Sequence, residues 1–113
     1  MTLMNLTYHK TLTEKKWFLL SFAEQMANIG SEVERTIIWR KKNDQEYSRI
    51  SFERALELID LTRLDSKNHH CLKELCRTRE MLVDWFFDNQ YNSNDSIWQK
   101  YFLAFNYLAR ILT

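Results

Sequence analysis

The chain of 113 residues carries 16 basic and 15 acidic side chains, contains no proline and has one glycine, Gly30. A formal charge of +1 argues against the strongly basic balance of a dedicated nucleic-acid-binding domain, although a local basic patch is compatible with it. Sheets and long loops usually rely on glycine and proline for their turns. The composition therefore predicts a single all-α domain whose helices are joined by short polar segments.

The cysteines and the apolar runs bear on the cellular compartment. The longest apolar run, Trp17 to Ala23, is far shorter than the ~20 residues that a membrane-spanning helix needs. Cys71 and Cys76 would face different sides of one helix, and they lack the paired spacing of a zinc site. We therefore expect a cytoplasmic protein with two reduced thiols, no cofactor and no membrane contact.

Residues 1–20 are predicted to form an N-terminal arm. Thr11 and Glu14 fit a capping box, which indicates a short helical turn within residues 13–20. The arm carries apolar side chains on every side, so it must pack against the rest of the chain: Leu3, Leu6, Tyr8, Trp17, Leu20.

A long helix is predicted over residues 21–42. Ser21 and Glu24 form a second capping box, and an apolar stripe follows at helical spacing: Phe22, Met26, Ile29, Val33, Ile37. Ser31 with Glu34 would also allow a helix to restart after Gly30. Because the stripe keeps its phase through Gly30, we expect one continuous helix and a close helix crossing at the glycine.

Three further helices are predicted near residues 45–64, 66–88 and 95–112. Short polar links join them, so residues 21–113 should form an antiparallel four-helix bundle. The helix at 66–88 is expected at its centre, with a core stripe that also contains Arg79: Leu72, Leu75, Cys76, Leu82, Val83, Phe86.

Arg79 needs an acidic partner if it lies inside a packed stripe, because a buried unpaired guanidinium is too costly. Asp60 and Glu32 both lie at the margins of their helices' core faces. We predict an internal ion pair of Arg79 with one of these acids. An anion-binding site at Arg79 is the alternative.

An acidic edge follows the helix at 45–64, where Glu53, Glu57 and Asp60 are spaced i, i+4, i+7. Together with Glu32 and Glu34 it resembles the all-α nucleoside triphosphate pyrophosphohydrolases, which hold Mg²⁺ with acidic pairs on neighbouring helices. Asn28 stands where that family has the first upstream acid. The simpler interpretation is a solvated acidic face interleaved with arginines.

Arg63 precedes His69 and His70 by six and seven residues. This spacing resembles the arginine–spacer–histidine signature of the HEPN superfamily, whose dimeric helical bundles include RNA-cutting toxins. The resemblance implies that the histidine and the arginine act on the RNA 2′-hydroxyl and phosphate. Leu64 stands where the family usually has a polar residue, and the alternative is that these histidines cap a helix start.

A resemblance to a family of short uncharacterised bacterial helical proteins covers most of residues 21–110. Three segments carry it: NIGSEVERTIIWR (28–40), FERALELIDLT (52–62) and LKELCRTREMLVDWFF (72–87). It implies the helical fold but no activity.

Five apolar side chains remain outside the predicted core stripes: Met81, Trp85, Leu103, Tyr107, Ile111. Either the N-terminal arm or a second copy of the chain must cover them, since exposing all five to water is unfavourable. We therefore expect a non-catalytic homodimer that binds another macromolecule, a protein in the first instance and RNA in the alternative.

Overall fold

The computed structural model describes residues 6–9 and 12–111, and this part of the chain is all-α. It contains five α-helices: α1 (Glu14–Phe18), α2 (Phe22–Lys41), α3 (Gln45–Leu64), α4 (Leu72–Phe86) and α5 (Asp95–Ile111). A 3₁₀-helix, η1 (Ser66–Cys71), leads from α3 into α4, and no strand occurs among the described residues. The expected all-α class is confirmed.

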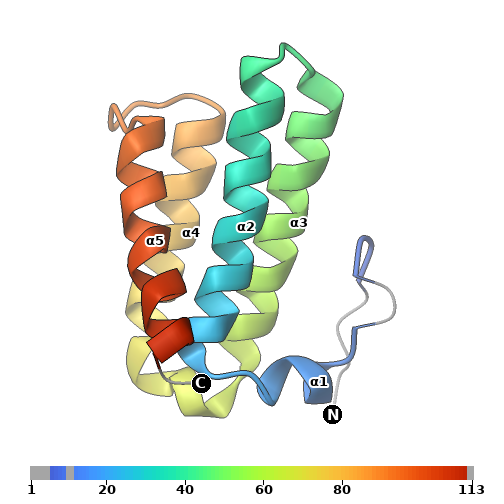
Figure 1. The fold of residues 1–113 in the computed structure, drawn as a ribbon, viewed down its shortest axis with the longest axis vertical. Coiled ribbons are helices and arrows are strands. Elements are labelled where there is room, and N and C mark those ends of the chain that lie inside the picture. Colours follow the sequence, from blue (N-terminus) through green and yellow to red (C-terminus); the bar gives the residue numbers. More distant parts are fainter. Residues whose placement is uncertain (1–5, 10–11, 112–113) are drawn as a thin grey trace.

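The four long helices stand side by side and run alternately up and down (Figure 1). Helix α2 packs closely along both α3 and α5, and α3 also packs against α4. The segment expected at the centre is therefore not the central one, and α2 has that place. An apolar stripe shows that a helix needs neighbours, but it does not identify which helices supply them.

Helix α2 begins and ends where its local sequence dictates. The Ser21 hydroxyl accepts from the Glu24 N–H at 3.1 Å, and the Glu24 carboxylate accepts from the Ser21 N–H at 2.9 Å. The helix continues through Gly30 without a break and ends before Asn43, which adopts φ 60°. Asparagine tolerates this left-handed conformation better than most residues, which explains the sharp turn into α3.

The core face of α4 differs from the stripe expected for it. The buried residues of this helix are Leu75, Thr78, Leu82 and Trp85. The Trp85 side chain is only 3% exposed, because it packs between Phe52 and Trp98 and lies under the Arg40 guanidinium. Trp85 therefore belongs to the core and not to a free surface, and Met81 is likewise partly buried against the core.

Helix α5 contributes only a narrow stripe to the core. Trp98 and Phe102 are buried, and Tyr101 and Phe105 are partly buried beside them. Leu108 of this helix is exposed. No helix in the described part of the chain combines the length and apolar character needed to cross a membrane.

Candidate functional site

The acidic edge of α3 anchors the N-terminal arm. The backbone N–H groups of Thr7, Tyr8 and His9 donate to the Glu57 carboxylate at 3.3, 3.1 and 2.9 Å. The His9 Nδ1 lies 3.2 Å from the same carboxylate, and the Tyr8 hydroxyl donates to Glu53. Burial alone would raise the pKa of Glu57, but these donors more than offset it, so that pKa is lowered.

The three carboxylates of this edge do not converge on one point. Glu53 and Glu57 are occupied by the arm, whereas Asp60 pairs with Arg63 at 3.1 Å and with Arg79. Among the described residues, no group of three or more histidine, cysteine or acidic side chains could hold a metal ion. The predicted metal-ligand candidates therefore bind the arm or form ion pairs in the structure.

Arg79 pairs with Asp60, one of the two acids considered for it. The Arg79 Nε and Nη2 donate to the two Asp60 oxygens at 2.8 and 3.3 Å, which is a bidentate contact between α4 and α3. Both side chains keep about one third of their surface exposed, so the pair lies at the edge of the core and not inside it. Glu32 has other partners: its carboxylate pairs with Arg35 and Arg54.

The arginine and histidines of the HEPN-like spacing lie on two different elements. Arg63 is in the last turn of α3, whereas His69 and His70 lie in the 3₁₀-helix η1, and all three are exposed. The hydrogen bond found for the Arg63 guanidinium goes to Asp60. No described contact brings the guanidinium and an imidazole together as a catalytic pair would require.

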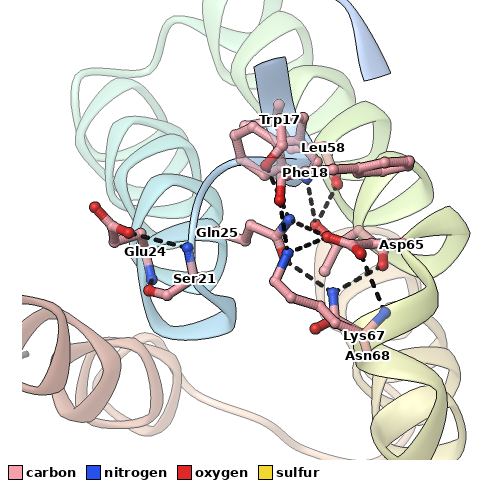
Figure 2. A network of polar contacts seen from close by, with 10 residues as sticks. Trp17, Phe18, Ser21, Glu24, Gln25, Leu58, Asp65, Lys67 and Asn68 are labelled. Carbon is pink, nitrogen blue, oxygen red and sulfur yellow. Dashed lines mark hydrogen bonds and ion pairs between the residues drawn. The ribbon is translucent and has the colours of Figure 1, made fainter. Parts of the chain in front are cut away.

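A buried polar network joins α1, α2 and η1 (Figure 2). The Gln25 amide donates to the Trp17 carbonyl at 3.0 Å and to the Asp65 carboxylate at 2.9 Å. Asn68 donates to the Gln25 side-chain oxygen at 2.8 Å and to the Thr62 carbonyl at 3.1 Å. The network therefore ties the end of the arm to the corner between α3 and η1.

Asp65 and its neighbour Lys67 complete this network. The Lys67 ammonium donates to Asp65 and to the Phe18 carbonyl, the latter at 3.1 Å. Burial would raise the pKa of Asp65, but the hydrogen bonds from Lys67 and Gln25 lower it below its ordinary value. The folded structure therefore favours the charged carboxylate of Asp65.

Sequence reasoning overlooked Gln25 and Asn68, although a signal for Gln25 existed. Gln25 precedes Met26 of the apolar stripe and lies four residues before Ile29, so it shares the buried face. A polar side chain on such a face needs partners from elsewhere in the fold. Asn68 lies in a polar link, where the sequence offers no corresponding periodicity.

The Tyr101 hydroxyl connects α5 to α4. It donates to the Glu74 carboxylate at 3.0 Å and lies 3.2 Å from the Thr78 hydroxyl. Burial raises the pKa of Tyr101 to about 12, and the Glu74 carboxylate beside it acts in the same direction. This side of α5 therefore packs against α4.

The outer face of α5 is different, because its apolar side chains lie in water. Leu103, Tyr107 and Ile111 follow one line at i, i+4, i+8 and are 63%, 66% and 59% exposed. Ile97 and Leu108 are also exposed on this helix. The described part of the arm lies beside α3, on the other side of α2 from α5 (Figure 1).

Comparison of the chain with protein-family models, with curated proteins and with solved structures finds no significant match. The functional argument therefore rests on the surfaces and contacts of this chain.

Proposed function

We propose that this protein is a non-catalytic interaction protein that forms a homodimer through the outer face of α5. In this proposal α2 to α5 act as one antiparallel four-helix bundle, and the N-terminal arm of residues 1–20 is fastened to it along α3. The observation that carries the proposal is the exposed line of Leu103, Tyr107 and Ile111. Contiguous exposed apolar side chains of this size are typical of interaction surfaces.

A second copy of the chain fits this surface. In an antiparallel contact centred on Tyr107, Leu103 of one protomer would face Ile111 of the other, since Tyr107 lies midway between them. Such a line is self-complementary, as a two-fold symmetric interface requires. The formal charge of only +1 supplies little electrostatic repulsion between copies.

The test is the molar mass in solution, measured by sedimentation equilibrium across the micromolar range. We expect a dimer for the wild type and a monomer for Tyr107→Asp, because a charge at the centre of an apolar interface leaves an unpaired ion there. Leu19→Asp is the matched control, since Leu19 is 80% exposed and lies at the end of α1 rather than on α5. A wild-type monomer throughout this range, or equal dissociation of both variants, would refute the α5 dimer.

A further inference from the structure

A cavity of about 540 Å³ lies between the arm, α2 and α3, and none of the described residues that line it comes from α5. The arm contributes Tyr8 and His9, and leucines form an apolar part of the wall: Leu12, Leu20, Leu58. The polar part of the wall includes three charged side chains: Glu32, Arg35, Arg54. An apolar lining with a few converging polar groups, at a volume within the usual ~300–1,000 Å³, is typical of small-molecule sites.

One buried acid positions both arginines of this cavity. The Glu32 Oε1 accepts from Arg35 Nη1 at 2.6 Å, and the Glu32 Oε2 lies 3.3 Å from Arg54 Nε. The Glu32 side chain is only 6% exposed, whereas Arg54 and Arg35 are 39% and 57% exposed. The carboxylate thus holds the two guanidinium groups from inside while they extend toward solvent.

This cluster has an incomplete hydrogen-bond set. Arg54 Nε and Glu32 Oε2 are buried and lie 3.3 Å apart, so they pair with each other as ions without the geometry of a hydrogen bond. The Arg35 and Arg54 guanidinium groups share the single Glu32 carboxylate, so these three side chains together carry one excess positive charge. Both arginine side chains are partly exposed, so their remaining N–H groups and the surplus positive charge are placed to bind an anion in the cavity.

We propose that this cavity binds a small organic oxyanion, a phosphate monoester or a carboxylate with an apolar body. Arg35 and Arg54 bind the anionic group, because the planar guanidinium matches oxyanions with paired N–H donors. The leucine wall receives the apolar body. Glu32 is a positioning residue, which holds the arginines without touching the ligand.

The experiment titrates the full chain with phenyl phosphate, benzoate and the neutral analogue benzyl alcohol, and follows backbone amides by ¹H–¹⁵N NMR. We expect saturable shifts at Ser31, Arg35 and Arg54 with at least one of the two anions and none with the alcohol. Phenyl phosphate and benzoate separate the two sources of oxyanion. The absence of saturable shifts with both anions at millimolar concentration would overturn the proposal.

Variants then distinguish a site from general charge attraction. Arg54→Gln and Arg35→Gln should each lower the affinity for the anion roughly tenfold or more, since each removes a charged hydrogen-bond donor. Arg49→Gln is the matched control on α3, where Arg49 pairs with the exposed Glu53, and it should leave the affinity unchanged. Equal weakening by Arg49→Gln would overturn the proposal.

A cavity-filling variant keeps the test valid if loss of an arginine disturbs the fold. Ser31 is exposed at the cavity wall on α2, so Ser31→Trp should abolish anion binding by occupying the space while the far-ultraviolet circular dichroism stays that of the wild type. Undiminished anion binding by this folded variant would place the anion elsewhere and overturn the proposal.

Discussion

Gly30 of α2 and Phe102 of α5 meet so closely that a side chain at residue 30 has no room. A Cβ atom built on Gly30 would lie 2.6 Å from the Phe102 Cβ and 2.9 Å from its Cγ. The Cβ is fixed to the backbone, so rotation of the phenyl ring cannot relieve this contact. The two helices can approach this closely only because residue 30 is glycine.

Gly30→Ala is therefore expected to destabilise the protein by about 1–3 kcal/mol, as overpacked core positions do, despite the ~1 kcal/mol by which alanine favours a helix. Urea unfolding followed by circular dichroism measures the change. Ser31→Ala, at the exposed neighbouring position, is the control and should be neutral or slightly stabilising. A variant Gly30→Ala that is more stable than the wild type would show that α2 and α5 separate without cost.

Gln25→Leu tests the buried polar network of Figure 2. The substitution leaves the Asn68 amide and the Trp17 carbonyl without the partner that they share, and it removes a donor from Asp65. We expect a loss of about 2–4 kcal/mol in the free energy of unfolding, because buried polar groups lose their hydrogen bonds. Gln99→Leu, the same exchange at an exposed site on α5, should change stability by less than about 0.5 kcal/mol.

We expect acidic pH to lower the free energy of unfolding, because the Glu57 and Asp65 carboxylates become protonated. The ordinary pKa values are 4.5 for Glu57 and 3.8 for Asp65, and the fold lowers both. A lowered pKa means that the folded state favours the carboxylate, so its stabilising contribution is complete above the ordinary pKa. That contribution disappears as the pH falls through the lower, folded value.

The measurement is a series of urea unfolding curves from neutral pH to about pH 3. Glu57→Gln should be less stable than the wild type at neutral pH and should lose less stability on acidification. Glu80→Gln, at an exposed position on α4, controls for the change in net charge. A wild-type pH dependence in Glu57→Gln would mean that the arm is not held by this carboxylate.

Substitutions of Trp85 and of Tyr107 should distinguish the core from the proposed interface. Trp85→Ala should cost about 3–5 kcal/mol, because it empties a buried aromatic site between α3, α4 and α5. Tyr107→Ala should leave the stability of the monomer within about 0.5 kcal/mol, since the side chain is exposed there.

The two substitutions should also differ in their dependence on protein concentration. Thermal unfolding at several micromolar concentrations should show a wild-type midpoint that rises with concentration, because self-association stabilises the folded state by mass action. This rise should persist in Trp85→Ala and disappear in Tyr107→Ala. The reverse pattern would indicate that Trp85 lies in the interface and would contradict the packing described above.

The sequence by itself determined the helices, because their signals are local. The Ser21–Glu24 capping box, the polar links and the apolar periodicity each act within a few residues, and the observed bounds lie close to the predicted ones. The single helix expected over 66–88 is the main departure, since a 3₁₀ turn precedes α4. The close crossing expected at Gly30 also occurs, because glycine inside a continuous apolar stripe has a direct steric meaning.

Only the tertiary structure decided which side chains meet. Asp60 rather than Glu32 pairs with Arg79, Trp85 enters the core while Tyr107 stays outside, and Glu57 binds the backbone of an arm about 50 residues away. The physical reason is that helical periodicity identifies a face but not its rotation toward a particular neighbour. A shift of one position, about 100°, exchanges a buried residue for an exposed one, and that rotation is set by how all the helices pack together.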